Sequence, residues 1–327
     1  MSLPKRLHLA HLPTPIQYVE RLSSTLNKDL YLKRDDHTGI EFSGNKVRKL
    51  EFAVQEALDE GAEVLITCGG LQSNHARATA AVARRLGLDC HLVLRGTPEL
   101  PDHGNLLLDL LMDVNITYME LEDFNEHHME MMRALKEEYD ASGKPAYLLP
   151  MGASNAIGSF GYMAAYEEIL LQEMNMETNF DTIVCAVGSG GTHAGLVLGN
   201  LLHGNKHRVI GIPIADDSTF FKPVVQSLVE ECLERISPET KIPEDALQFL
   251  DSYAGRGYAL NTQEEMAFIR QMATDEGVIF DPVYTGKSFR GLVKEIEKGT
   301  LADSEKILFI HTGGLYGLFP KAGEFSL

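Results

Sequence analysis

The stretch TIVCAVGSGGTHAG, residues 182–195, decides the fold class. Its first six residues form an almost uninterrupted apolar run, which is typical of a β-strand buried on both faces. A glycine-rich turn follows directly, and a helical pattern then begins and extends over 191–203. A buried strand that passes through a glycine turn into a helix predicts an α/β protein built on parallel sheets.

The same alternation extends in both directions along the chain. Eight β-rich runs predict strands at 30–33, 63–67, 90–95, 116–121, 146–149, 182–187, 208–214 and 306–311. Apolar residues at helical spacing predict helices at 44–60, 73–86, 104–113, 125–140, 157–173, 191–203, 220–236, 262–276 and 286–298. The segment 236–262 contains prolines and glycines and is predicted to be irregular. This order indicates two α/β units with right-handed crossovers.

Composition narrows the class of protein. The chain has 327 residues, 29 Lys and Arg against 47 Asp and Glu, and a formal charge of −18. This acidity argues against nucleic acid and anionic membrane as partners. The four cysteines form no CxxC pair, so we expect neither a disulfide framework nor a metal site. The chain has no apolar leader and no apolar stretch of membrane length, and we expect a cytoplasmic protein.

The glycine turn at 188–191 predicts a phosphate site, because glycines let the backbone N–H groups at a helix start approach an anion. A tight turn without a ligand is the alternative. Two nucleotide motifs fail in this sequence. A dinucleotide fingerprint would need glycine or alanine where His193 stands, and a Walker loop ending in TGKS would need glycine at Asp281. The predicted phosphate therefore belongs to another kind of ligand.

Two further turns follow predicted strands. CGGLQSNHA, at 68–76, places Ser73, Asn74 and His75 after one strand, and HTGG, at 311–314, places Thr312 after another. Ser73 or Asn74 also serves as a helix N-cap in the simplest interpretation. Because ligands of α/β proteins bind at the carboxyl ends of the strands, the three turns predict one shared crevice.

Lys46, in SGNKVRKLEF at 43–52, lies in the first turn of a predicted helix. The positive end of a helix dipole disfavours an ammonium group, so a lysine here breaks a local rule. Such exceptions cluster at functional sites. A solvated lysine is the alternative interpretation.

These motifs together resemble the family of D-cysteine desulfhydrases and 1-aminocyclopropane-1-carboxylate (ACC) deaminases, which are fold-type II pyridoxal-phosphate enzymes. The resemblance rests on SGNKVRKLEF, LQSNHARATAA, AVGSGGTHAG, DPVYTGKS and LFIHTGG, and it extends to LPTPIQYVERLS and KRDD near the N-terminus. It therefore covers almost the whole chain. It implies two open, mostly parallel sheets flanked by helices, with 49–158 as a small domain inserted into a large one formed by 1–48 and 159–327.

The resemblance also implies a role for each matching residue. Lys46 would carry pyridoxal phosphate as a Schiff base, with Lys49 near the cofactor's phosphate. Asn74 would contact the ring hydroxyl, while Ser73, Asn74 and His75 would bind the substrate. Tyr253 and Tyr284 match tyrosines on the substrate side. The phosphate-binding loop would comprise Gly188, Ser189, Gly190, Gly191 and Thr192.

The sequence departs from the family pattern at two places, and only the second bears on the reaction. The family commonly reads GGNK where this chain has Ser43 before Gly44. ACC deaminases resemble DPVYEGKS, whose glutamate serves the pyridine nitrogen, whereas this chain has Thr285 there and Thr312 in HTGG. A carboxylate keeps that nitrogen protonated and makes the ring a deep electron sink, which a hydroxyl does less well. The paired threonines therefore favour expulsion of a thiolate over opening of a cyclopropane.

The resulting prediction is a pyridoxal-phosphate-dependent lyase that converts D-cysteine to pyruvate, ammonia and hydrogen sulfide, with Lys46 as the base and Tyr253 or Tyr284 as the proton donor. ACC deaminase activity is the main alternative. Elimination from another β-substituted amino acid, such as cysteate or β-chloroalanine, also stays open, as does a non-catalytic pyridoxal-phosphate-binding module. The resemblance suggests a homodimer.

Overall fold

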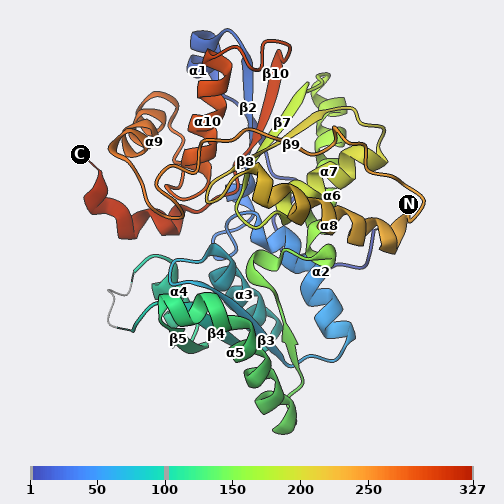
Figure 1. Ribbon diagram of the computed structural model, residues 1–327, viewed down its shortest axis with the longest axis vertical. Coiled ribbons are helices and arrows are strands. Elements are labelled where there is room, and N and C mark those ends of the chain that lie inside the picture. Colours follow the sequence, from blue (N-terminus) through green and yellow to red (C-terminus); the bar gives the residue numbers. More distant parts are fainter. Residues whose placement is uncertain (1–2, 99–102, 326–327) are drawn as a thin grey trace.

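The structure, a computed structural model, describes residues 3–98 and 103–325 (Figure 1). Within these residues the chain forms two sheets with helices around them. The larger sheet has six strands in the order β1-β2-β10-β7-β8-β9. Only the β1–β2 pair is antiparallel, and the other pairs are parallel. The strands are β1 (Ile16–Tyr18), β2 (Asp29–Lys33), β7 (Thr182–Val187), β8 (Arg208–Pro213), β9 (Gln248–Phe249) and β10 (Lys306–Ile310).

The smaller sheet has four parallel strands in the order β5-β4-β3-β6. They are β3 (Val64–Gly70), β4 (Asp89–Arg95), β5 (Asn115–Met119) and β6 (Ala146–Leu148). All four lie inside the segment 49–158 that the resemblance assigns to an inserted domain. The exact domain boundaries stay a prediction.

Helices cover both sheets, as Figure 1 shows. Around the larger sheet lie α1 (Glu20–Leu26), α6 (Ala156–Met176), α7 (Gly191–Leu202), α8 (Ser218–Ile236), α9 (Gln263–Glu276) and α10 (Thr285–Glu297). Around the smaller sheet lie α3 (Asn74–Leu86), α4 (Asn105–Leu111) and α5 (Leu121–Ala141). Helix α2 (Lys46–Asp59) lies where the two parts meet. Three short 3₁₀ segments complete the order: η1 (Asp35–His37), η2 (Met151–Ala153) and η3 (Leu315–Glu324).

The central strand β7 shows why the strand-turn-helix stretch organises the fold. All six of its residues are buried, as expected for a strand with helices on both faces. The helix that follows it, α7, packs closely against α6. A Cβ at Gly195 would lie 2.2 Å from the carbonyl oxygen of Ser159, so only glycine allows this approach.

The predicted α/β architecture with two mostly parallel sheets is confirmed. All eight predicted strands and all nine predicted helices are present, with ends shifted by a few residues. The sequence did not indicate β1, β9 or α1, which have 3, 2 and 7 residues, too few for a periodic pattern to be recognised. Among the described residues, no helix combines the length and the apolar character needed to cross a membrane. All four cysteines are buried free thiols.

Candidate active site

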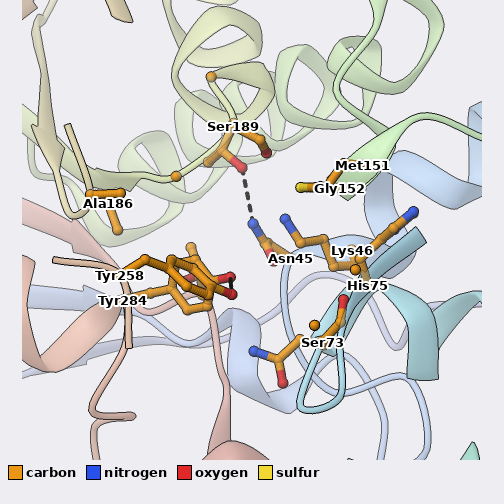
Figure 2. A pocket seen from close by; sticks show the side chains of 18 of the residues that line it. Asn45, Lys46, Ser73, His75, Met151, Gly152, Ala186, Ser189, Tyr258 and Tyr284 are labelled. Atoms are coloured by element: carbon orange, nitrogen blue, oxygen red, sulfur yellow. Dashed lines mark hydrogen bonds between the residues drawn. The ribbon is translucent and has the colours of Figure 1, made fainter. Parts of the chain in front are cut away.

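A cavity of about 300 Å³ lies between the two sheets, at the carboxyl ends of their strands. Residues from all three predicted turns line it, including Ser73, Asn74 and His75 after β3, Gly188 and Ser189 after β7, and Thr312 after β10. The predicted shared crevice is therefore confirmed. Figure 2 shows Lys46 with His75 on one side of this cavity, and Tyr258 with Tyr284 on the other.

Lys46 is the first residue of α2 and lines the cavity. The loop before it is tightly held. A Cβ at Gly44 would lie 2.7 Å from the Thr312 carbonyl oxygen, and the side-chain amide of Asn45 donates to the Thr192 hydroxyl at 3.0 Å. The neighbouring Ser43 hydroxyl donates to the carbonyl oxygen of Asp36 at 2.9 Å, which gives this departure from the family's glycine a structural role. Burial of the Lys46 ammonium lowers its pKa to about 8.

Lys49 lies one turn further along α2 and is fully buried. Its ammonium donates to the Gly152 carbonyl oxygen at 3.2 Å and to the Ser154 hydroxyl at 3.0 Å. A Cβ at Gly191 would lie 2.7 Å from this ammonium, so Lys49 reaches the glycine turn although it does not line the open cavity. Burial, and then the charge of Lys46, hold the pKa of Lys49 well below its usual value.

The glycine turn begins α7. Gly190 is its N-cap residue with φ +86°, and no side chain caps this helix start. Ser189 lies beside it, and its hydroxyl is 2.8 Å from that of Ser154. A hydroxyl pair, a buried ammonium and an uncapped helix N-terminus together form an environment that favours an anion.

The turn after β3 presents Ser73 and Asn74 to the cavity. Ser73 is the N-cap of α3, and its hydroxyl oxygen accepts from the Ala76 N–H at 3.1 Å. The N-cap interpretation is therefore confirmed, and it leaves the Ser73 hydroxyl hydrogen available to a ligand. The Asn74 side-chain oxygen accepts from the Asn105 amide at 3.0 Å, and the Asn105 oxygen accepts from Arg77 Nε at 3.1 Å. This chain of contacts directs the Asn74 amide hydrogens away from Asn105.

His75 also lines the cavity. Its Nε2 is 2.8 Å from the Thr67 hydroxyl, while its Nδ1 is buried with no partner among the described residues. Burial, and then the charges of Lys46 and Lys49, hold its pKa well below the usual value. The ring is therefore neutral at physiological pH, and its expected contact with a substrate carboxylate stays a prediction.

The two tyrosines expected on the substrate side separate in the structure. Tyr284 lines the cavity, but Tyr253 does not. The Tyr253 hydroxyl donates to the Glu295 carboxylate and accepts from the Lys298 ammonium at 3.0 Å, which ties it to the far side of α10. Tyr258, five positions further along the same irregular segment, lies in the cavity instead. Its hydroxyl is 2.7 Å from that of Tyr284. The structure therefore does not bring Tyr253 to the cavity as predicted, and Tyr258 lies there in its place.

The two threonines also take different positions. Thr312 lines the cavity, whereas Thr285 is fully buried behind it. The Thr285 hydroxyl donates to the Asp281 carboxylate at 2.7 Å and accepts from the Asp281 N–H at 2.9 Å. Asp281 also accepts from the N–H groups of Val283 and Tyr284, at 2.8 and 2.9 Å. Its carboxylate thereby organises the start of α10 and holds Thr285 in place, so of the two threonines only Thr312 lines the cavity.

Several lining residues were not identified from the sequence. Local signals could have found Asn45, which precedes Lys46, and Gly152, in the turn-rich segment 151–159. No local signal marks Arg95, Phe124 or Tyr258, because their place at the cavity depends on how distant segments pack. The remaining lining residues not predicted are Gly69, Gly70, Met151, Ala186, Ala215 and Asp216.

The residues present fit pyridoxal phosphate. Lys46 and Lys49 are withdrawn from water, and neither forms an ion pair with an acid of the described residues. Two such cations beside an uncapped helix start lack a counter-charge, which a phosphate would supply. The glycines at 188 and 191 leave space there, since a Cβ at Gly188 would lie 2.9 Å from the Tyr284 ring. A primary amine whose pKa is about 8 is also suited to bind an aldehyde covalently.

Comparison with known proteins places the chain in a family. The family described as "Pyridoxal-phosphate dependent enzyme" matches residues 7–313. The chain is 42% identical to the bifunctional D-cysteine desulfhydrase/1-aminocyclopropane-1-carboxylate deaminase, mitochondrial, of Arabidopsis thaliana, over 97% of this chain and 80% of that protein. It is 38% identical to the D-cysteine desulfhydrase of Klebsiella pneumoniae (strain 342), over 96% of this chain and 95% of that protein.

A solved structure agrees with these sequence matches. The crystal structure of an ACC deaminase homologue superimposes with a TM-score of 0.91 at 40% identity, covering 98% of this chain and 95% of the other. The predicted cofactor, pyridoxal phosphate, and the fold-type II architecture are thereby confirmed. The chain belongs to the D-cysteine desulfhydrase/ACC deaminase family of pyridoxal-phosphate-dependent enzymes.

Proposed function

We propose that this enzyme catalyses α,β-elimination from D-cysteine, releasing pyruvate, ammonia and hydrogen sulfide. One observation carries the choice of reaction: Thr312 lines the cavity, while Thr285 is buried behind it with its hydroxyl held by Asp281. The Asp281 carboxylate is itself occupied by three backbone N–H groups and that hydroxyl. The two threonines have no carboxylate, and the Asp281 carboxylate beside Thr285 is already occupied, so none of these three residues offers a free carboxylate to the cofactor.

This difference bears on the chemistry. Bound pyridoxal phosphate withdraws electrons from the substrate's α-carbon, and it does so most strongly when a carboxylate keeps its ring nitrogen protonated. A threonine hydroxyl supports that protonation less. Expulsion of a thiolate from the β-carbon needs less electron withdrawal, because the leaving group takes the bonding electrons. Opening of an unactivated cyclopropane ring lacks that advantage, and the site therefore favours β-elimination.

Lys46 and the turn after β3 supply the first half of the reaction. Lys46 would hold the cofactor and, once displaced by the substrate amine, would remove the α-proton as a neutral amine. Its pKa of about 8 makes this neutral form abundant near physiological pH. The Ser73 hydroxyl, whose oxygen already accepts from Ala76, would donate its hydrogen to the substrate carboxylate. This contact would orient the α-hydrogen for removal.

The tyrosine pair supplies the second half. Tyr258 and Tyr284 share a hydrogen bond of 2.7 Å, so one phenol donates to the other and the second keeps a hydrogen for a ligand. Burial raises the pKa of both hydroxyls, so both are protonated at physiological pH. The pair lies across the cavity from Lys46 (Figure 2), where the β-substituent of a bound amino acid would lie. It would therefore protonate the leaving sulfur.

The test is the release of 2-oxo acid by the purified enzyme loaded with pyridoxal phosphate. D-cysteine, L-cysteine, L-cysteate and ACC are compared. Reaction of any of the first three compounds would give pyruvate, and reaction of ACC would give 2-oxobutanoate. We expect the highest kcat/KM with D-cysteine, together with one sulfide per pyruvate. Faster turnover of ACC would instead support the deaminase activity, and no 2-oxo acid from any amino acid would support a non-catalytic binding protein.

The cytoplasmic location and the homodimer predicted from the sequence stay predictions. Fractionation of the source cells tests the first, and light scattering of the purified enzyme tests the second. A monomer with full activity would contradict the predicted assembly.

A further inference from the structure

Lys287 is a buried lysine on α10 that the proposed reaction does not use. It belongs to TGKS at 285–288, where the preceding sequence excludes a nucleotide-binding loop. Its ammonium donates to the carbonyl oxygens of Ala254 and Gly257, both at 2.7 Å. Among the residues that the structure describes, it forms no ion pair with a carboxylate. Both of these partners lie in one short segment, so the ammonium ties that segment to α10.

The two carbonyl groups begin two consecutive turns. The Gly257 N–H donates to the Ala254 carbonyl oxygen at 3.3 Å, and the Leu260 N–H donates to the Gly257 carbonyl oxygen at 3.2 Å. Hydrogen bonds between residues three positions apart close β-turns. Tyr258 is the second residue of the second turn, and its backbone nitrogen belongs to the planar peptide group whose carbonyl Lys287 holds. Lys287 therefore fixes the peptide group from which Tyr258 extends.

Apolar packing does not hold this segment. No residue of 254–260 belongs to the hydrophobic core of the described chain, and Gly255, Arg256 and Leu260 are exposed. A segment without buried apolar side chains opens easily unless its hydrogen bonds restrain it. The two hydrogen bonds from Lys287 are therefore its main attachment to α10.

The position of Tyr258 matters to the proposed chemistry. Its hydroxyl is 2.7 Å from that of Tyr284, and the pair is proposed to face the leaving group (Figure 2). Tyr284 is the N-cap residue of α10, three positions before Lys287. The start of α10 thus holds Tyr258 at two points, its hydroxyl through Tyr284 and its backbone through Lys287. A displacement of about 1 Å at a reacting group can lower a rate by about 10²-fold.

We propose that Lys287 is a positioning residue for this reaction, which fixes the backbone before Tyr258 and thereby keeps the tyrosine pair directed at the leaving group. The inference rests on the proposed function, because it concerns the proton that the leaving sulfur receives. When the Cβ–S bond breaks, both electrons stay on sulfur, which takes this proton from the pair. Chloride leaves the same carbon with both bonding electrons and needs no proton. The two leaving groups therefore distinguish positioning from a general loss of structure.

The first experiment compares these leaving groups. The kcat/KM values for D-cysteine and β-chloro-D-alanine are measured with the pyridoxal-phosphate enzyme, as wild type and as Lys287→Met. We expect the value for D-cysteine to fall roughly 10- to 100-fold, because the proton donor is displaced. The value for β-chloro-D-alanine should change by less than about 2-fold, since a general acid contributes only where a proton is transferred. Lys287→Gln, whose amide keeps a hydrogen-bond donor, should lie between wild type and Lys287→Met.

The second experiment asks whether Lys287 acts through Tyr258. The double variant Lys287→Met/Tyr258→Phe should have the same kcat/KM for D-cysteine as Tyr258→Phe alone, because the lysine then has no hydroxyl to position. Losses that multiply would overturn the inference. Lys294→Met is the matched control, because Lys294 lies on the same helix, is partly exposed and does not line the cavity. It should leave both kcat/KM values unchanged.

A third measurement does not depend on turnover. Amide hydrogen exchange of the pyridoxal-phosphate enzyme is followed in a peptide covering 254–260, where the N–H groups of Gly257 and Leu260 report on the two turns. In Lys287→Met these groups should exchange at least about 10-fold faster, because local opening becomes easier. Exchange elsewhere and the visible absorbance of the cofactor should match the wild type.

The outcomes separate the inference from the proposed function. If Lys287→Met lowers turnover of both substrates equally, raises exchange throughout the protein or does not fold, Lys287 serves the fold as a whole and the inference is wrong. If turnover of D-cysteine is unaffected, the inference is also wrong, whatever the exchange shows. If the wild-type enzyme eliminates from neither amino acid, the proposed function fails, and exchange in 254–260 alone decides whether Lys287 holds the backbone of Tyr258.

Discussion

Helix α2 carries three cations, Lys46, Arg48 and Lys49, and the charges around them differ. Arg48 faces a cluster with Lys33, Asp35 and Glu168, in which two cations meet two carboxylates: Arg48 Nη2 lies 2.8 Å from Asp35 and 3.0 Å from Glu168. We call these four residues the ion-pair cluster. Lys46, which lines the cavity, and Lys49, which lies behind it, come from the same helix and form no ion pair within the described chain; we call them the cavity lysines.

The pKa values of the three cations on α2 follow this difference, whereas burial lowers the pKa of Lys33 even beside Asp35 and Glu168. Burial alone would lower the pKa of Arg48, but Asp35 and Glu168 more than reverse that effect and raise it. Around the cavity lysines burial acts without opposition from a carboxylate, and both pKa values fall. A buried cluster whose charges cancel needs no ligand and serves the structure of the protein. A buried cluster with excess positive charge requires an anion from outside the chain. Charge balance therefore distinguishes structural cations from cofactor-binding ones on a single helix.

The largest expected effect is at Lys46. In Lys46→Ala we expect pyruvate release to fall by at least about 10³-fold, because the group that attaches the cofactor and moves the α-proton is lost. The visible absorbance of the lysine-bound cofactor should disappear, while the thermal unfolding of the cofactor-free protein should be little changed. A persistent visible band would show that another residue carries the cofactor.

Breaking the ion-pair cluster should instead lower the stability of the cofactor-free protein, which Lys46→Ala leaves little changed. Arg48→Met leaves Asp35 fully buried without its cation, so we expect the free energy of unfolding to fall by about 3–5 kcal/mol. Denaturant unfolding of the cofactor-free protein measures this change. The double variant Arg48→Met/Asp35→Leu should recover part of the loss. Wild-type stability in the single variant would contradict the structural role of the cluster.

The two tyrosines of the irregular segment provide a sharper test within the cavity. Tyr258→Phe removes the hydroxyl that bonds Tyr284, so we expect kcat for D-cysteine to fall by about 10²-fold, the lower end of the usual contribution of a positioned proton donor. Tyr253→Phe is the matched control, since its hydroxyl contacts Glu295 and Lys298 outside the cavity. It should change kcat by less than about 2-fold, with any effect confined to stability. Equal losses in both variants would contradict the assignment of Tyr258.

Lys49 and Lys33 form another matched pair, because both lysines are fully buried. Lys49→Met removes a cation without a carboxylate, so we expect the cofactor-free protein to become more stable by about 1 kcal/mol. Its affinity for pyridoxal phosphate should fall roughly 10-fold. Lys33→Met removes the partner of Glu168 and should destabilise the protein instead. The comparison needs unfolding curves with and without cofactor, and a loss of stability in Lys49→Met would overturn the distinction drawn on α2.

The smallest expected effect is in the pH dependence of cofactor capture. Only neutral Lys46 reacts with the aldehyde, and a pKa lowered from 10.5 to about 8 makes the neutral amine abundant above pH 8. The rate at which cofactor-free enzyme gains visible absorbance should therefore rise about tenfold from pH 7, pass its half-maximal value near pH 8 and level off by about pH 9. A rate that keeps rising toward pH 10.5 would show that the pKa of Lys46 is not lowered in the cofactor-free protein.

The sequence predicted the elements of the fold because each carries a local pattern. Buried strands such as β7 are apolar throughout, and α2 repeats its apolar residues at helical spacing. Glycine turns and the lysine at the start of α2 are equally local signals, so the turn at 188–191 and Lys46 could be predicted without a structure to lie at one site, and both line the cavity. The short β1 and β9 could not, since 3 and 2 residues form through their pairing with neighbouring strands.

Side-chain positions in irregular segments were not predictable in the same way. Tyr253 and Tyr258 lie five residues apart in the same irregular segment, with Gly255 and Gly257 between them, and only the packing of α10 decides which one reaches the cavity. A Cβ at Gly291 of α10 would lie 2.7 Å from the Tyr253 ring, so that ring is seated on the helix. Thr285 lies away from the cavity for a similar reason, because Asp281 holds its hydroxyl in the first turn of α10.

By itself, then, the sequence determined the order of strands and helices, the glycine turn at 188–191 and the lysine at the start of α2. All of these depend on residues close together in the chain. Only the tertiary structure decided which buried cations are paired. Arg48 and Lys49 are adjacent in sequence, and there only the family resemblance distinguishes them. In the structure Arg48 meets Glu168, 120 positions away, while Lys49 meets Ser154, 105 positions away. The physical reason is that the charge balance of a buried group depends on all of its neighbours in space, and in this protein those neighbours come from distant segments.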